Sequence, residues 1–236
     1  MYVEIHTLII LCDIIRGIKV HSFSREGKMA AQQQSSWRKM SYEEYLTLHQ
    51  TDPSAKWEYI KGYAVMMTGG TFSHSRVGGQ LFALLNAEFQ EGPCYVCNSD
   101  MAVRVAEDIT YVPDCSISCD VSDAQSENLV LQHPYLVAEV LSPSTELKDR
   151  MTKLRLYQAH PTIEEILLIN TRHQEIEVYQ CDPEDHTTWK HHRYFPGQEV
   201  QLNILDITLP VDAVYRRSKV PILAPPFVED MPEEES

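Results

Sequence analysis

Apolar residues recur at helical spacing in some segments of the chain and at strand spacing in others, which predicts a mixture of helices and strands. The first helix is expected to begin at Ser41, because Ser41 and Glu44 have the spacing of a capping box. A longer helix is expected from an N-cap at Ser73. Its inward stripe would contain the apolar residues Val77, Leu81, Leu84, Leu85 and Phe89.

Strand-like segments occupy much of the remaining chain. The two-residue turn Lys61-Gly62 predicts a β-hairpin of residues 57–60 and 63–67. Residues 135–141 are almost entirely apolar, which is typical of a strand buried on both faces. Alternation at 175–180 predicts a half-exposed strand. Further strands are predicted near 94–105, 110–118, 165–169 and 189–195, and a short helix at 211–216.

A helix is also predicted between the strands at 135–141 and 165–169. Leu147, Met151 and Leu154 are expected to form its inward stripe, and Asp149, Lys153 and Tyr157 to follow at i, i+4 and i+8 on an adjoining face. The strand–helix–strand order predicts a parallel crossover beside antiparallel hairpins. The expected fold class is therefore α/β, with a mixed β-sheet flanked by helices.

Two acidic residues stand where a carboxylate is out of place. Glu139 interrupts the apolar run at 135–141, and Asp114 follows a proline in a strand-like segment. Burying an unpaired carboxylate is costly, so each must be protonated, paired or metal-bound. If the two strands are neighbours, the carboxylates converge at one sheet edge, where oxygen ligands suit Mg²⁺ or Mn²⁺. The backbone carbonyl of Val140 is a candidate further ligand, and Lys153 could orient a water or stabilise developing charge.

The same residues also have structural explanations, which the sequence leaves open. Asp114 after a proline is a common turn former at a strand end. Glu139 could form a buried ion pair with Lys153 or Arg155. Asp149 and Lys153 could be a solvated i, i+4 pair of little consequence.

The combined motif contains Pro113-Asp114, then Glu139-Val140-Leu141-Ser142-Pro143-Ser144-Thr145, then Asp149-x-x-x-Lys153-x-x-x-Tyr157. It resembles the Uma-type family of restriction endonucleases within the PD-(D/E)xK nuclease superfamily, over roughly residues 40 to 215. The resemblance implies a restriction-endonuclease-like fold and divalent-metal hydrolysis of DNA phosphodiesters. It also implies that Asp114 and Glu139 are metal ligands and that Lys153 is the catalytic lysine.

The chain departs from the superfamily pattern in one respect. That pattern has a lysine two residues after the acid, where this chain has Leu141. The replacement is Lys153, 14 positions after Glu139 (153 minus 139), and this relocation is typical of the Uma-type pattern. The role of the lysine is therefore less firmly implied than the roles of the two carboxylates.

The resemblance extends to two earlier positions and adds accessory candidates. Glu58 lies in a segment similar to the family's N-terminal hairpin, and His74 lies where its long helix begins. Each has an ordinary alternative, because Glu58 could be a surface residue and His74 could cap its helix. Tyr157 is expected to pack rather than take part in chemistry. The accessory candidates are Glu58, His74, Asp149 and Tyr157.

Charge and cysteine content narrow the function classes. The formal net charge of -14 argues against broad nonspecific affinity for nucleic acid, although a small metal-bridged site stays possible. Six cysteines are too few for a disulfide scaffold in a chain of this length. Cys94 and Cys97 with Cys115 and Cys119 could form a four-thiolate zinc site. The preferred interpretation makes Cys115 and Cys119 small core residues in a reducing, cytoplasmic compartment.

The expected organisation is one nuclease-like domain at residues 37–217 between two extensions. Residues 1–36 are read as an N-terminal extension, and residues 1–28 as the product of a misassigned start codon before Met29. Residues 218–236 are read as an acidic, Pro-rich tail. The apolar run near the N-terminus is too short for a membrane span.

The leading functional expectation is a Mg²⁺- or Mn²⁺-dependent endonuclease acting on DNA, as a homodimer if both strands are cut. A second expectation is a catalytically silent interaction module with the same fold, which the overall acidity favours. A carboxylate-pair glycosidase is a distant third, because the three tryptophans at 37, 57 and 189 are scattered.

Overall fold

The computed structural model describes residues 37–67 and 69–223, to which the structural statements below refer. The expected N-terminal extension, including the proposed start at Met29, lies outside the described residues, as does most of the expected tail. Within the described ranges, no helix is long and apolar enough to cross a bilayer. Ser218 and Val220, just past the expected end of the domain, are buried.

A six-stranded mixed sheet forms the centre of the domain, in the order β12-β11-β10-β9-β7-β4. Only β9 and β10 in this sheet run parallel, and the other neighbours are antiparallel. The predicted parallel crossover is thus confirmed. The strands are β4 (Tyr95–Asn98), β7 (Cys115–Ser118), β9 (Pro134–Val140), β10 (Glu165–Ile169), β11 (Ile176–Cys181) and β12 (Trp189–Tyr194).

A second six-stranded sheet has the order β1-β3-β2-β6-β5-β8. Its β2–β3 hairpin confirms the predicted turn, because Lys61 and Gly62 have φ values of 48° and 84°, the left-handed conformation that such turns require. The strands are β1 (Trp37–Lys39), β2 (Trp57–Ile60), β3 (Tyr63–Met66), β5 (Ala102–Ala106), β6 (Ile109–Tyr111) and β8 (Val130–Leu131). The ribbon of β13 (Glu199–Leu202) and β14 (Ile207–Pro210) was not predicted.

The helices begin at polar caps, as their sequences indicate. The capping box at Ser41 is confirmed, because Ser41 and Glu44 exchange backbone-to-side-chain hydrogen bonds of 2.7 and 3.2 Å. The N-cap of the long helix is Thr71, so the prediction of Ser73 was wrong by one half-turn. The helical segments are α2 (Tyr42–Thr51), α3 (Phe72–Glu88), α4 (Glu146–Lys148), the π-helical turn η2 (Asp149–Lys153), α5 (Leu154–Gln158), the 3₁₀ turn η3 (Ile204–Asp206) and α6 (Val211–Val214).

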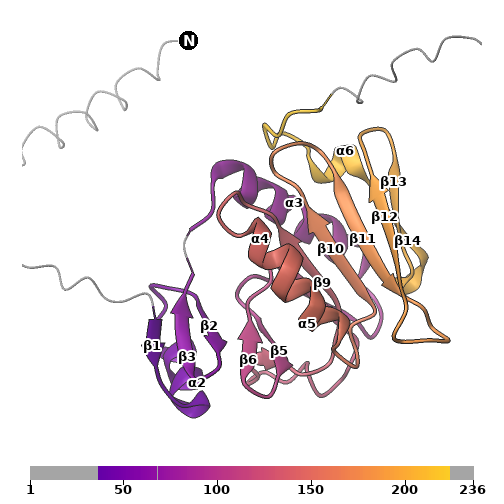
Figure 1. Ribbon diagram of the computed structural model, residues 1–236. Helices are drawn as coiled ribbons and strands as arrows, with labels where there is room; N and C mark the ends of the chain where they lie inside the picture. The colour runs from indigo at the N-terminus through magenta and orange to yellow at the C-terminus, as the bar shows by residue number, and fades with distance from the viewer. Residues whose placement is uncertain (1–36, 68, 224–236) are drawn as a thin grey trace, which may run out of the picture. The chain divides into compact units, whose positions relative to one another are not determined.

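Strand β9 is buried on both faces, which confirms the interpretation of its apolar run. On one face, Ala138 and Val140 belong to the core that contains the apolar stripe of α3. On the other face, Val137 and Leu141 belong to a core that contains Tyr157 of α5. Helices α3 and α5 therefore cover opposite faces of the central sheet, and α4 and α5 can be followed beside β9 in Figure 1.

The helix after β9 presents a different face from the one predicted. Leu147 and Met151 are 78% and 53% exposed, whereas Asp149, Lys153 and Tyr157 are buried. The predicted inward stripe was wrong for Leu147 and Met151, whereas Leu154 is partly buried and packs against the core that contains Tyr157. The buried acids of neighbouring strands turn the polar side chains of this helix inward. Once Glu139 is buried, leaving it without a partner would be costly, and Lys153 on the inward face of the helix supplies that partner.

Strand β11 is buried almost throughout, so the predicted half-exposed strand was wrong. Its polar residue Glu177 is 6% exposed because Arg150 pairs with it at 2.6 Å and His191 contacts it at 3.0 Å. Glu175, just before the strand, is buried beside Arg193. The alternating pattern predicted that Glu177 faces solvent, but Arg150 of η2 and His191 of β12 cover it.

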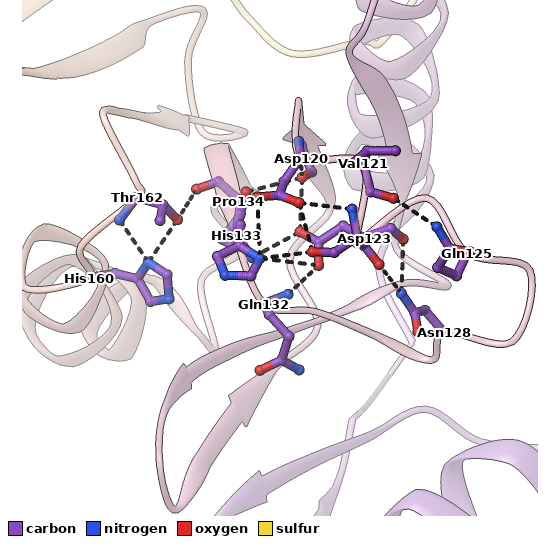
Figure 2. A network of polar contacts seen from close by, with 12 residues as sticks. Asp120, Val121, Asp123, Gln125, Asn128, Gln132, His133, Pro134, His160 and Thr162 are labelled. Atoms are coloured by element: carbon purple, nitrogen blue, oxygen red, sulfur yellow. Dashed lines mark hydrogen bonds and ion pairs between the residues drawn. The ribbon is translucent and has the colours of Figure 1, made fainter.

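The segment between β7 and β9 is held by a polar network around Asp123 (Figure 2). The carboxylate of Asp123 accepts hydrogen bonds of 2.8 Å from the backbone N–H groups of Gln132 and His133 and from the Ser118 hydroxyl. Asn128 donates to the Asp123 carbonyl at 3.2 Å. Both oxygens of this buried carboxylate have partners within the chain, so the carboxylate anchors the loop.

Two cysteines form a disulfide that the sequence interpretation did not include. Cys94 and Cys119 are bonded across the ends of the antiparallel pair β4–β7. The interpretation of Cys119 as a free core residue was therefore wrong, and the four-thiolate zinc alternative falls with it. Cys115 is buried and free, as predicted. Disulfides are typical of oxidising compartments, so this bond does not support the reducing compartment that was expected.

The two leucines that were assigned inward positions give a direct test of the fold. Leu81→Ala removes a fully buried side chain of α3 and should lower the free energy of unfolding by about 2–5 kcal/mol. Leu147→Ala removes an exposed side chain and should change it by less than about 0.5 kcal/mol. Urea titration followed by circular dichroism measures both. A loss of similar size in the two variants would contradict the observed orientation of the helix.

Candidate active site

A buried lysine lies at the centre of the candidate site. The Lys153 Nζ atom is 2.9 Å from Glu139 Oε1, 3.0 Å from Glu58 Oε1 and 3.5 Å from Asp149 Oδ1. Lys148 pairs with the other oxygen of Glu58 at 2.6 Å. We call Glu58, Glu139, Asp149, Lys148, Lys153 and Tyr157 the lysine–carboxylate cluster. It joins the β2–β3 hairpin, strand β9 and the helix that follows β9.

The π-helical turn η2 and helix α5 direct three polar side chains toward β9. Asp149 and Lys153 begin and end the π-helical turn, and Tyr157 follows one turn later. The Tyr157 hydroxyl donates a hydrogen bond of 2.6 Å to Glu139 Oε1, and its ring packs edge-on against Tyr111. Tyr157 therefore both packs and holds the orientation of the Glu139 carboxylate.

Asp114 lies beside this cluster, at the start of β7. The β7–β9 register pairs Cys115 with Ala138, so its continuation by one residue places Asp114 opposite Glu139. Asp114 Oδ2 accepts a hydrogen bond of 2.7 Å from the backbone N–H of Val140 and lies 3.4 Å from His74 Nε2. The condition set by the sequence argument, that the two strands are neighbours, is thus met.

Each of the two strand-end carboxylates uses one oxygen for these contacts. Glu139 accepts both Lys153 and Tyr157 on Oε1, and Asp114 contacts both Val140 and His74 through Oδ2. In a strand, the N–H and C=O of one residue point toward the same neighbouring strand. Because the N–H of Val140 points to Asp114, its carbonyl is directed to that same edge. Glu139 Oε2, Asp114 Oδ1 and this carbonyl are oxygens of the kind that Mg²⁺ prefers.

The electrostatics of the site show a shortage of positive charge. Burial raises the pKa of Glu139 to about 8, and repulsion from Asp149 and Asp114 adds to this while Lys153 opposes it. Burial likewise raises the pKa of Asp149. Burial would raise the pKa of Glu58 too, but Lys153 and Lys148 outweigh it and lower that pKa. The positive charge of Lys148 and Lys153 is therefore smaller than the negative charge that the four carboxylates would carry when ionised. A further bound cation would offset this difference.

The neighbouring carboxylates also raise the pKa values of two basic groups, the Lys153 ammonium and the His74 imidazole. Burial acts to lower the pKa of Lys153, but Glu139, Glu58 and Asp149 raise it well above its ordinary value. The hydrogen bond to Asp114 raises the pKa of His74. Lys153 is thus a permanent cation of the site, and it can stabilise negative charge but cannot serve as a general base.

The structure brings most of the predicted residues together and decides some alternatives. The buried ion pair of Glu139 is with Lys153, and Asp149 and Lys153 are buried rather than solvated. Glu58 is buried rather than on the surface. His74 interacts with Asp114 in addition to its place in the first turn of α3.

Sequence reasoning missed two residues of the site. Lys148 neutralises Glu58, and Tyr111 lies under both ammonium groups, with ring-centroid distances of 5.3 and 5.1 Å to Lys148 and Lys153. Such cation–π contacts stabilise a buried ammonium. Lys148 is one residue before Asp149, so helical spacing gave no reason to group it with Glu58. Tyr111 lies three residues before Asp114, where its sequence pattern indicates only an aromatic residue that packs in a strand.

The residues fit a divalent cation only in an open arrangement. In the portion of the chain that the structure covers, no group of three or more histidine, cysteine, aspartate or glutamate side chains is arranged to hold a metal ion. Mg²⁺ commonly binds through one or two carboxylates, with waters and substrate phosphate completing its shell. Asp114, Glu139 and the Val140 carbonyl match that type of site in number and in chemistry.

A cleft of about 580 Å³ opens at Asp114 and His74. Its walls come from the segment before β2, from the first turns of α3 and from the end of β4. Pockets of this size hold ligands or parts of larger substrates. The carboxylate of Asp114 is therefore accessible from outside, whereas Glu139 and Lys153 are buried and do not line the cleft.

Comparisons with known proteins define the class of this chain. Residues 42–212 match the model of the Uma2 family, described as "Putative restriction endonuclease", and the chain belongs to that family. It is 34% identical over 179 residues to the uncharacterized protein slr1290 of Synechocystis sp., a match that covers 75% of this chain and 92% of the relative. It is 30% identical over 139 residues to the uncharacterized protein sll1609 of the same organism, covering 58% of this chain and 78% of the relative.

A solved structure shares the fold. The crystal structure of a putative nuclease belonging to DUF820 from Anabaena variabilis matches with a TM-score of 0.58 at 19% identity, over 73% of this chain and 96% of that chain. The predicted family and the restriction-endonuclease-like mixed α/β fold are therefore confirmed.

The central position of Lys153 predicts a specific stability pattern. Lys153→Met should lower the free energy of unfolding by about 3–5 kcal/mol, because Glu139 and Glu58 lose their buried partner. Adding Glu139→Gln should restore part of that loss, because it removes one of the uncompensated charges. Lys148→Met is the control, since Lys148 is partly exposed and its loss should cost less. Guanidinium unfolding of the four proteins measures these differences. Equal losses for Lys148→Met and Lys153→Met would show that burial of Lys153 is not decisive.

Proposed function

We propose that the protein is a divalent-metal-dependent nuclease that hydrolyses DNA phosphodiester bonds. The observation that carries the proposal is the pair of adjacent strand-end carboxylates, Asp114 and Glu139, each with one oxygen outside its contacts to the chain. Membership of the Uma2 family supports it, as does the fold shared with a protein described as a putative nuclease. Asp114, Glu139 and the Val140 carbonyl would hold Mg²⁺ or Mn²⁺.

The residues around the carboxylates have distinct proposed roles. A cation bound there would polarise the phosphodiester and lower the pKa of an attacking water. Lys153 would stabilise charge that develops on the phosphate oxygens, and Tyr157 would keep the Glu139 carboxylate in position. His74, held by Asp114 at the cleft, would contact the substrate phosphate.

Cleavage of DNA tests the proposal directly. Wild-type protein should cleave DNA with Mg²⁺ or Mn²⁺ and lose this activity in excess chelator. Asp114→Asn and Glu139→Gln should each reduce the rate by at least about a hundredfold, because each removes a charge that holds the cation. Glu127→Gln, at an exposed position between β7 and β8, should cleave at the wild-type rate. Activity of Glu139→Gln close to that of wild type, with folding retained, would refute the assigned role.

Binding of Mn²⁺ is a separate expected outcome. Calorimetric titration should detect one Mn²⁺ site in the wild type and a weakened site in Asp114→Asn. Protein that binds no Mn²⁺ and cleaves no DNA would favour the second candidate, a catalytically silent interaction module. The net charge of -14 supports that candidate, because it weakens electrostatic attraction to nucleic acid.

The proposed activity has implications for the number of protein copies that act together and for the location of the protein in the cell. One site of this kind hydrolyses one strand, so cutting both strands of a duplex would need two copies of the protein. We propose a cytoplasmic location because DNA is available to the enzyme there, and the Cys94–Cys119 disulfide is then one that persists in a reducing compartment. Fractionation of the natively expressed protein would test it, and secretion would contradict it.

A further inference from the structure

The cleft at Asp114 has an unusual wall, in which two consecutive glycines interrupt a long helix. Gly78 and Gly79 lie in the interior of α3, a helix of 17 residues, and both line the cleft together with Asp114 and His74. Glycine in a helix interior is destabilising relative to alanine. A pair of glycines at this position therefore needs a reason.

Packing within the chain supplies no such reason at Gly79. A Cβ atom built at Gly79 meets nothing within 4 Å, and one built at Gly78 meets only the Val140 side chain at an ordinary distance of 3.7 Å. Neither glycine has the left-handed conformation that would exclude other residues. The space in front of Gly79 is the cleft itself, so the helix backbone there is open to a group from outside the chain.

The dimensions and charge of the cleft restrict what that group can be. A volume of about 580 Å³ is in the range of pockets that enclose a single small ligand. A B-form duplex cannot enter this cleft as a whole, because its major groove alone is about 12 Å wide. A duplex also carries one charge for about every 1.7 Å of its axis, and proteins that grip it over many phosphates do so with a basic surface. The net charge of -14 opposes both forms of DNA, and it opposes the duplex more strongly because the duplex has the higher charge density.

The lining of the cleft has the chemistry of a site for one strand. Lys56 supplies a cation at the rim, where it is held by Ser99 at 2.7 Å and by Asp100 at 2.9 Å. Phe82 and Asn98 also line the cleft and offer an aromatic surface and an amide to a nucleobase. Proteins that bind single strands combine aromatic side chains, on which the bases stack, with positive charge along the backbone, and this cleft supplies Phe82 and Lys56 for these two tasks.

We infer that the substrate of this cleft is a single DNA strand, which lies against the Gly78–Gly79 segment of α3 as it passes Asp114. This inference rests on the proposed nuclease function and adds its substrate class. Gly79 is a positioning residue, because it has no side chain to keep the strand from the helix.

The first test compares substrates of equal sequence. With Mn²⁺, the full-length protein should cleave a single-stranded oligonucleotide at least about tenfold faster than the corresponding blunt duplex, a ratio that corresponds to about 1.4 kcal/mol of activation free energy. Binding of the two labelled oligonucleotides is measured in parallel by fluorescence anisotropy, in chelator, so that cleavage does not interfere. Equal rates and equal binding for the two substrates, or a preference for the duplex, would overturn the inference.

The second test separates a binding role of Gly79 from a structural one. Gly79→Ala should raise the midpoint of thermal unfolding by about 2–4 °C, because alanine favours the helix and its Cβ meets no atom. The same variant should weaken binding of the single strand and slow its cleavage by about tenfold or more, because the added carbon displaces the strand. Ala87→Ser adds one atom at an exposed position of α3 outside the cleft and should change neither reaction.

The outcomes distinguish failure of the inference from failure of the proposed function. Preferential binding of the single strand, weakened by Gly79→Ala but without cleavage in Mg²⁺ or Mn²⁺, would retain the inference and remove the nuclease activity. Equal cleavage of both substrates with no effect of Gly79→Ala would retain the nuclease activity and remove the inference. A Gly79→Ala protein that is more stable and unchanged in binding would show that no strand lies against α3 at this point.

Discussion

The burial of the Lys153 ammonium among carboxylates is the constraint on which the site depends. Transfer of one such charge from water into the protein is costly, and only partners at close distance can offset the cost. Here the partners come from a hairpin, a central strand and the helix itself, through Glu58, Glu139 and Asp149. The ammonium thereby fixes the positions of three elements that are distant in sequence. Removal of any one carboxylate would affect the geometry of the others.

The same constraint explains why a further cation would be attracted to the site, where acidic side chains outnumber the lysines. A protein that needed only a structural ion pair would require one acid for one lysine. This site surrounds Lys153 with three acids and places a fourth, Asp114, immediately before the neighbouring strand β7. Burial is the main cause of the raised pKa of Glu139, and repulsion of its ionised form by Asp149 and Asp114 adds to it. A hard divalent ion would relieve this repulsion, which is the argument for hydrolytic rather than purely structural use.

The sequence was sufficient to predict those features that local rules determine. The capping box at Ser41, the Lys61-Gly62 hairpin and the parallel crossover of β9 and β10 follow from spacing and turn chemistry, and all are present. Asp114 and Glu139 were recognisable because each violates the pattern of its own segment. Their placement on neighbouring strands is also present, although their roles as metal ligands stay a proposal.

Other features depended on contacts that no local rule reports. The exposed Leu147 and Met151 follow helical spacing, but the buried acids of two strands determine which side of the helix turns inward. The pattern around Glu177 predicts a solvent-facing side chain, but Arg150 of another element pairs with it and covers it. The Cys94–Cys119 bond needed the β4–β7 register, which the sequence did not specify. In each case a long-range partner outweighed the pattern of the segment itself.

The π-helical turn at Asp149–Lys153 has a consequence for how this family can vary. A π turn closes hydrogen bonds to the fifth residue, so it holds one residue more than an α turn of the same helix. A chain that lost a single residue here could therefore continue as a regular α-helix, with the segments before and after the turn in nearly the same relative orientation. The same deletion in an α-helical part of this segment would rotate one side by about 100° relative to the other. A change of one residue in length should thus be tolerated at this turn more readily than elsewhere in the helix, provided that Asp149 and Lys153 are retained.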